Sequence, residues 1–285
     1  MAATSSLKRQ KTFNLIKSIV LFLFFILYMM PFILIVVNSF KTKTGILKNP
    51  LSIIDPKGLT LDNFIKAFDK MEFVRSFTNS LIVTVISVLL IVILASMTAY
   101  LFVRVNWKAT KFLFVLMIAG MIIPFQAIMI PLVSIYGNML GILNSKATLI
   151  FMNVGFGISL AVFIYHGFIK SNVPLSLEEA AKLDGCNKLQ TFFLVVFPLL
   201  KSITSTIVIL DVLWIWNDYL LPSLVLTQKE NFTLPLSTYA FYGTYTVDYG
   251  AIMAALVLTV IPVIILYIFL QKHIISGVIS GAVKA

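Results

Sequence analysis

Long apolar runs alternate with short polar segments along the whole chain. Six runs have about 20 or more residues, the length that an α-helix needs to cross roughly 30 Å of hydrocarbon. None alternates with the period of two residues that membrane β-strands require. The pattern therefore predicts an all-α integral membrane protein with six transmembrane helices, at Ile19–Asn38, Ser80–Val103, Phe112–Tyr136, Ala147–Phe168, Ser202–Val225 and Gly250–Leu270.

The same pattern predicts the domain organisation: an N-terminal segment at 1–18, one six-helix membrane domain at 19–270 and a C-terminal tail at 271–285. Basic residues precede the first run, as they do in a secretory signal. The run is longer than the 7 to 15 apolar residues of a signal, however, and no small-residue cleavage site follows it. We interpret it as a retained first span.

Composition supports a lipid environment. Hydrophobic residues make up 60% of the chain and charged residues 12%, whereas a soluble domain has roughly a quarter charged residues. The net charge of +11 comes from residues in short segments between apolar runs, without a contiguous basic face. We therefore expect anionic lipid, and no nucleic acid, as the partner of these charges. The single cysteine, Cys186, excludes an internal disulfide.

Basic residues also indicate orientation. With the N-terminus inside, 13 of the 22 Lys and Arg residues lie on the cytoplasmic side. Seven of the others lie in the first external loop, at 41–75, where four acids and a short helix around Leu61–Arg75 indicate a small folded extracellular element. We expect both termini to be cytoplasmic.

Two prolines mark the third predicted span. Pro124 and Pro131 lie seven residues apart, and each removes a backbone donor on roughly the same helix face. The helix is either kinked beside a cavity or bent for ordinary packing, and the sequence leaves both interpretations open.

A loop at 169–201 between the fourth and fifth spans is far longer than a helical hairpin needs. Pro174 and Ser176 indicate a helix start, Glu178 and Glu179 fall in the first turn, and Gly185 suits a helix end. A second amphipathic piece follows. The first helix either docks in a groove of a partner protein or only connects the two spans.

Residue spacing in this loop resembles the EAA loop of binding-protein-dependent ATP-binding-cassette importer permeases. The matching positions are Glu179, Ala180, Ala181, Gly185, Val195 and Pro198, with Val195 and Phe197 where the family pattern has Ile and Leu. Three further segments resemble the carbohydrate-uptake permeases, in particular the second membrane subunit of the maltose-type importer: MIIPFQAIMIPL, WNDYLLP and the ending QKHIISGVISGAVKA, in which Ala285 replaces the usual glycine.

The resemblance implies a transport subunit without catalytic residues or a cofactor of its own, in a bacterial plasma (inner) membrane. ATP and Mg would be bound by a partner ATPase dimer, which also agrees with the lack of a phosphate-binding loop in this chain. The other implied partners are a homologous second permease, an extracellular sugar-binding protein and a sugar. The implied ATPase-coupling residues are Glu179, Ala180, Ala181, Asp184 and Gly185, with a weaker contribution from Gly281–Lys284.

Polar residues within the spans are candidates for a sugar path, because intramembrane acids usually face a cavity or a partner. Asp211, Trp214 and Asp218 follow at helical spacing, with Asn217 beside them. Gln126 and Asn153 lie in the third and fourth spans. The alternative for each is helix packing, which we favour for Trp216, Gln126 and Asn153. His166 and His273 show no metal-ligand spacing.

Two other classes of function have weaker support in the sequence. An intramembrane enzyme lacks support, because no catalytic motif occurs. An ion-coupled secondary transporter would use Asp211 and Asp218 as coupling acids, but it would not need the long loop, and no internal repeat is evident. The prediction is an alternating-access permease for a di- or oligosaccharide of the raffinose or multiple-sugar kind, contacting its binding protein through Lys41–Lys70 and Gln228–Asp248.

Overall fold

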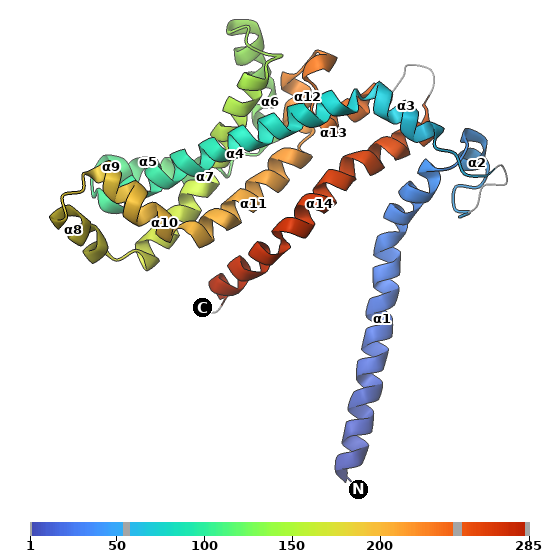
Figure 1. Cartoon of the computed structure of the whole chain (residues 1–285), viewed down its shortest axis with the longest axis horizontal. Coiled ribbons are helices and arrows are strands. Elements are labelled where there is room, and N and C mark those ends of the chain that lie inside the picture. The colour runs from blue at the N-terminus through green and yellow to red at the C-terminus, as the bar shows by residue number, and fades with distance from the viewer. Residues whose placement is uncertain (1, 54–57, 242–246, 283–285) are drawn as a thin grey trace. The chain divides into compact units, whose positions relative to one another are not determined.

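A computed structural model describes residues 2–53, 58–241 and 247–282 (Figure 1). Parts of both predicted external segments, and Lys284 of the predicted tail contact, lie outside these residues. Among the described residues, four helices are long and apolar enough to cross a membrane, and two bent helix pairs raise the number to as many as six. The four are α1 (Ala2–Ser39), α4 (Phe73–Arg104), α7 (Lys146–Asn172) and α14 (Tyr249–Ala282). The predicted all-α fold is thereby confirmed for the described residues, with four to six candidate membrane spans where the sequence predicted six.

The predicted third span is broken into two helices. α5 (Lys108–Gly120) is followed by α6 (Phe125–Val133) and the π-helical turn η1 (Ser134–Met139), and the two parts meet at 97°. Pro124 explains the break, because it lacks an N–H group and disfavours helical backbone at the residue before it. The bend that the prolines of the predicted span Phe112–Tyr136 indicated is thus located at Pro124, whereas Pro131 is tolerated inside α6.

The predicted fifth span, Ser202–Val225, is also interrupted. α11 ends at Asn217, and the carboxylate of Asp218 accepts hydrogen bonds from the backbone N–H groups of Leu220 (2.9 Å) and Leu221 (3.4 Å). Such side-chain to backbone bonds start a new helix in place of extending the old one. The elements in order are α8 (Leu175–Leu183), α9 (Lys188–Gln190), η2 (Thr191–Val196), α10 (Phe197–Leu199), α11 (Lys201–Asn217) and α12 (Leu220–Val225), with a 78° bend before α11.

The chain divides into two compact units. The first comprises residues 1–71 and 238–260 and contains the small folded element that the sequence predicted. Its helices include α2 (Lys43–Lys48), α3 (Asp62–Lys70) and the 3-10 turn η4 (Thr238–Phe241). Asn63 Nδ2 donates to the carbonyls of Ser39 (2.9 Å) and Lys41 (2.8 Å). α3 is shorter than the predicted Leu61–Arg75 helix, because Glu72 has left-handed backbone (φ 48°).

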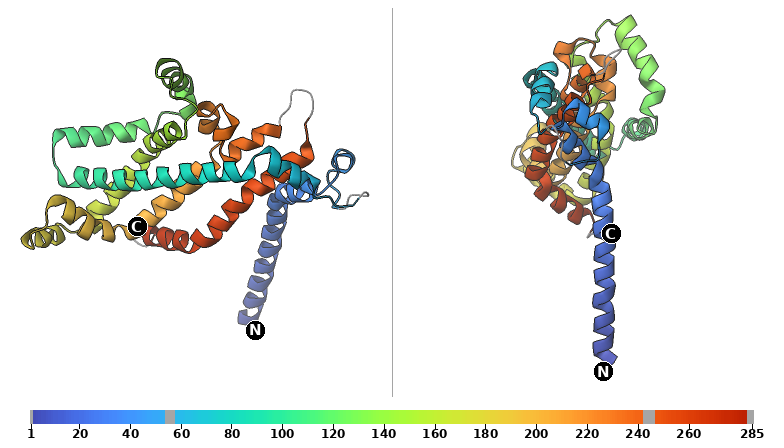
Figure 2. Two further views of the ribbon diagram at one scale, coloured as in Figure 1. Left: turned by 45° about the horizontal axis from the view of Figure 1, so that its top comes forward. Right: turned by 90° about the vertical axis from the view of Figure 1, so that its right-hand side faces the viewer.

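The second unit, residues 72–237 and 261–285, holds the main helix bundle. In this bundle α4 packs along α7 and α11 (Figures 1 and 2). Buried small residues such as Ala95 and Ala99 on α4 permit close approach, and Tyr165 of α7 bonds the hydroxyl of Thr204 at 2.9 Å. At one end of α4 lies α8, and at the other lie η3 (Lys229–Asn231) and α13 (Leu234–Ser237).

Candidate functional site

Helix α8 forms a short, sharply bounded element within residues 169–201. It begins after Pro174, whose backbone is extended, and it ends before Gly185, which has φ +86°. The N–H of Cys186 donates to the carbonyl of Ala181 at 2.9 Å, the closing bond of a helix that ends in a left-handed glycine. The helix start and end are where the sequence predicted them.

One side of α8 is fixed to the end of α4. The Glu178 carboxylate, 2% exposed, accepts a hydrogen bond from Arg104 Nε at 2.7 Å and another from the Tyr100 hydroxyl at 2.7 Å. Arg104 Nη2 also donates to the carbonyl of Val173 at 2.7 Å. The ion pair therefore joins the ends of α4 and α7 to α8. Sequence reasoning missed this role, because it treated Glu178 only as a first-turn acid.

The other side of α8 is exposed. Glu179, Ala180 and Asp184 are all accessible, and the Leu183 side chain is 89% exposed. Ala181, which the sequence grouped with the docking residues, is buried against the chain's own helices. The accessible side thus combines acidic groups, a small residue and a large aliphatic side chain, which suits docking on another protein.

A pocket of about 630 Å³ opens at the break between α5 and α6. Gln126, Trp214 and Asp218 of the predicted sugar path line it together. Gln126 lies in α6, Trp214 in α11, and Asp218 directly follows α11. α7 contributes Gly155, Phe156, Ser159 and Leu160. The pocket pairs aromatic and apolar surface with amide, hydroxyl and carboxylate groups, the combination that binds a sugar ring and its hydroxyls.

The other predicted path residues are not in that lining. Asn153 and Asp211 are buried, and Asn153 Oδ1 and Asp211 Oδ2 have no hydrogen-bond partner in the described ranges. Asn217 is exposed and donates to the carbonyl of its own helix residue Leu213 at 2.7 Å. Trp216 is buried with its ring 5.6 Å from that of Phe77, in edge-on geometry, which agrees with the packing interpretation.

The pocket also contains two small residues of α7 that the sequence analysis did not name. Gly155 and Ser159 lie one turn apart on α7 and both line the pocket. A Cβ atom at Gly155 would meet nothing within 4 Å, whereas one at Gly157 would lie 2.7 Å from Ile91 Cδ1. The sequence signal was the small residues at alternate positions, Gly155, Gly157 and Ser159, which indicate either close packing or a cavity. The structure has close packing at Gly157 and a cavity at Gly155.

A polar cluster holds the opposite end of α4. Asn79 Nδ2 donates to the carbonyls of Glu230 (2.9 Å) and Phe232 (3.0 Å), and Lys146 Nζ donates to Asn79 Oδ1 at 2.9 Å. Nearby, hydrogen bonds from Lys229 and then Arg75 hold the pKa of the Glu72 carboxyl below its ordinary value. These contacts tie the start of α7 and the η3 region to α4.

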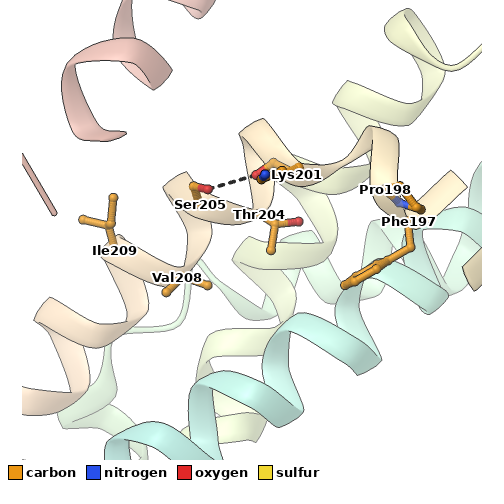
Figure 3. A pocket seen from close by; sticks show the side chains of 7 residues that line it. All are labelled: Phe197, Pro198, Lys201, Thr204, Ser205, Val208 and Ile209. Carbon is orange, nitrogen blue, oxygen red and sulfur yellow. Dashed lines mark hydrogen bonds between the residues drawn. The ribbon is translucent and has the colours of Figure 1, made fainter. Parts of the chain in front are cut away.

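A shallow groove of about 460 Å³ follows the bend from α10 to α11. Figure 3 shows Thr204 and Ser205 among apolar side chains, with the Ser205 hydroxyl donating to the Lys201 carbonyl at 3.0 Å. Small hydroxyl residues among apolar ones are typical of surfaces on which membrane helices pack. The groove offers little to a sugar, because its lining is almost entirely apolar.

Comparison with known proteins extends these observations. The model of the family "Binding-protein-dependent transport system inner membrane component" matches residues 91–280. The chain is 43% identical over 259 residues to the "Probable starch degradation products transport system permease protein AmyC" of Thermoanaerobacterium thermosulfurigenes, covering 91% of this chain and 93% of that protein. It is 38% identical to the "Multiple sugar-binding transport system permease protein MsmG" of Streptococcus mutans, covering 91% and 93%.

A third relative is the "Melibiose/raffinose/stachyose import permease protein MelC" of Bacillus subtilis, 37% identical with 90% and 92% covered. Among solved structures, a chain of a bacterial ABC transporter involved in the import of the acidic polysaccharide alginate matches with a TM-score of 0.77. The match covers 92% of this chain and 96% of that one at 23% identity, so it supports the fold alone.

Proposed function

Because the chain belongs to the family of binding-protein-dependent transport system inner membrane components, we propose that it is a permease subunit of an ATP-driven importer of di- or oligosaccharides. A second permease would complete the translocation path, and two ATPase subunits would bind ATP and Mg. The names of three relatives refer to starch degradation products, multiple sugars, and melibiose, raffinose and stachyose. They support short oligosaccharides as the substrate class.

The observation that carries the proposal is the two-sided character of α8. Its Glu178 side is fixed to α4, while Glu179, Ala180 and Leu183 face outward. A helix held rigidly on one side can transmit a push received on the other. We assign the outward side to the ATPase, with Glu179 as its main charged contact and Gly185 as the residue that permits the sharp end of the helix.

The pocket at the α5–α6 break is the proposed section of the sugar path. Trp214 would stack on the apolar face of a sugar ring, and Gln126, Ser159 and Asp218 would exchange hydrogen bonds with its hydroxyls. Since two backbone N–H groups already bind the Asp218 carboxylate, its remaining lone pairs would accept from substrate. Loose, partly exposed contacts suit a path that must release what it binds.

Orientation follows from the same assignment. If α8 contacts an ATPase, Arg104 and both termini lie on the cytoplasmic side, and Asn79 and Lys146 lie on the outer side. The external binding protein would then contact Lys41–Lys70 and Gln228–Asp248. The groove in Figure 3, with Thr204 and Ser205, is the surface that we assign to the second permease.

The test is uptake by proteoliposomes that contain this chain, the second permease, the ATPase and the binding protein encoded with it. Radiolabelled raffinose and maltotriose should accumulate only with Mg-ATP inside the compartment that the ATPase faces. A non-hydrolysable ATP analogue is the matched control. Uptake driven by a proton or sodium gradient without ATP would contradict the proposal and favour an ion-coupled carrier with Asp211 and Asp218 as coupling acids.

A further inference from the structure

The contact between α8 and α4 bridges residues far apart in sequence. Arg104 and Glu178 are separated by 74 positions. By contrast, α8 follows α7 after a linker of two residues, Val173 and Pro174. The link from α8 onward to α11 runs through the short elements α9, η2 and α10 and contains a 78° bend. The ion pair therefore gives α8 a direct attachment to a helix to which the backbone does not connect it.

This attachment has the features of a rigid joint. A buried carboxylate is stable only when its charge is paired and its oxygens are hydrogen-bonded, and both oxygens of Glu178 are occupied at 2.7 Å. The Arg104 guanidinium is a planar fork, and its second nitrogen binds the Val173 carbonyl. Tyr100 also packs against Phe192 of η2, with ring centroids 5.3 Å apart. Rotation of α8 against α4 would break several of these contacts together.

The opposite end of α4 is held equally firmly. Asn79 is 3% exposed and binds Glu230, Phe232 and Lys146, and the hydroxyl of Ser80 accepts from the N–H of Leu234 at 2.8 Å. Between its two ends α4 is one uninterrupted helix of 32 residues. It is thus one continuous helical connection from the α8 joint to the loop elements at the other end of the bundle.

We propose that Glu178 is a positioning residue that locks α8 to α4, so that the two helices move as one rigid body during the transport cycle and carry motion of the ATPase across the membrane to the 228–234 region. This inference rests on the proposed function. It assigns separate tasks to the two neighbouring acids: Glu179 contacts the partner, and Glu178 transmits the motion to the rest of the chain.

The experiment measures the distance between spin labels at Leu177→Cys on α8 and Leu89→Cys on α4, in a Cys186→Ala background. Both positions are exposed, and Leu177 is not among the residues assigned to the ATPase contact. The assembled transporter is compared without nucleotide and after trapping with Mg-ATP and vanadate. The wild-type pair should give one narrow distance distribution that is the same in both states. Glu178→Gln should broaden that distribution and shift it on trapping, with about a tenfold loss of raffinose or maltotriose transported per ATP.

The controls separate positioning from general damage. Glu179→Gln removes the carboxylate next to Glu178 but leaves the contact between Glu178 and Arg104 intact. The label distance in this variant should therefore equal that of the wild type. Arg104→Lys keeps the positive charge but loses the second hydrogen bond, to the Val173 carbonyl. It should also broaden the distance distribution and shift it on trapping, and it replaces Glu178→Gln if that variant does not assemble.

Two results would overturn the inference. One is a wild-type label distance that changes on trapping, and the other is a Glu178→Gln or Arg104→Lys distribution that matches the wild type in both states. If an ATPase copurifies and hydrolyses ATP, either result removes this inference alone. If no ATPase copurifies with the wild type, the proposed function fails and takes the inference with it.

Discussion

Glu178 and Glu179 are neighbours in α8 but lie in opposite environments. Glu178 is 2% exposed and bonded to Arg104 and Tyr100, whereas Glu179 is exposed. Successive residues of an α-helix are turned by about 100°, so one acid can face the chain's own bundle while the next faces outward. A two-residue Glu-Glu sequence thereby provides one anchor and one free charged contact.

Stimulated ATP hydrolysis should depend on the charge of the side chain at Glu179. Glu179→Lys should strongly lower ATP hydrolysis stimulated by sugar and binding protein, because it reverses the charge offered to the ATPase, and Glu179→Gln should lower it less. The yield of protein in membranes should not change, since the exposed Glu179 side chain forms no hydrogen bond or ion pair with the residues that the structure describes. ATPase assays on the reconstituted transporter provide the measurement, and normal stimulation of Glu179→Lys would contradict the docking role.

A side chain introduced at Gly185 should disturb the end of α8 and lower stimulated ATPase activity. Gly185 has φ +86°, a region that costs an ordinary residue roughly 1–2 kcal/mol and a β-branched residue more. Gly185→Val should therefore extend or reorient the end of α8 and reduce stimulated ATPase activity. Gly167→Val is the control, since a Cβ there meets nothing within 4 Å, and it should leave that activity nearly unchanged. Equal effects would argue against a special role for the α8 end.

Two glycines on α7 should behave differently when enlarged. Gly155→Leu would project into the pocket and should block sugar uptake while the melting temperature stays close to wild type, because the added side chain has space. Gly157→Leu would collide with Ile91 and should destabilise the bundle by about 1–3 kcal/mol. Thermal melting and uptake assays on both variants provide the comparison. Full transport by Gly155→Leu would show that the pocket is not on the path.

The two tryptophans of α11 offer another matched pair. Trp214→Ala should raise the sugar concentration for half-maximal uptake about fivefold, the scale of one lost aromatic contact, with little change in stability. Trp216→Ala should instead lower stability by about 3 kcal/mol or more, because Trp216 is buried against Phe77. If Trp216→Ala alone altered the apparent affinity, the assignment of roles within this helix would be reversed.

Buried and exposed ion pairs should differ in their effect on stability. Arg104→Ala leaves the Glu178 carboxylate buried without its cation, a change that costs about 3–5 kcal/mol when one partner of a buried pair is removed. Glu72→Gln breaks exposed contacts with Lys229 and Arg75 and should leave the melting temperature unchanged. Differential scanning calorimetry of the purified complex measures the melting temperature of each variant. Equal melting temperatures for Arg104→Ala and Glu72→Gln would contradict the claim that the buried pair contributes more to stability.

The pH dependence of the Glu72 contacts has a definite sign. Since Lys229 and Arg75 hold the pKa of Glu72 below its ordinary value, the contacts are present at neutral pH and are lost only as the pH falls through that lowered value. In an NMR titration, the midpoint of the Glu72 carboxyl carbon signal should therefore lie below that of an ordinary glutamate, and Lys229→Ala should raise it toward the ordinary value. An unchanged midpoint in Lys229→Ala would contradict the assigned cause.

Elements that are determined by neighbouring residues in the sequence could be predicted, and those determined by specific side-chain contacts could not. α1, α4, α7 and α14 follow from apolar run length, and the ends of α8 follow from Pro174 and Gly185, because these signals are local. The interruption at Asp218 was not predicted, since its side chain competes with the helix by bonding the two following residues that start α12. The hydrophobicity of the sequence around Asp218 does not show whether its side chain will form these backbone hydrogen bonds.

The site residues show the same limit. Gln126, Trp214 and Asp218 were chosen as intramembrane polar or aromatic residues, and they line one pocket. Asp211 and Asn153 met the same criterion but lie buried outside that lining, because the face that a polar residue takes in a bundle is set by packing against other helices. The Arg104–Glu178 pair joins positions 74 residues apart, and a single sequence gives no signal for it.

The most direct test of the central claim is affinity purification of the detergent-solubilised chain from its native membrane, with mass spectrometry of the proteins that copurify. We predict recovery of a second, different permease together with a nucleotide-binding ATPase, and reduced ATPase recovery with Glu179→Lys. A homo-oligomer of this chain without an ATPase would contradict the claim that α8 couples an ATP-driven importer.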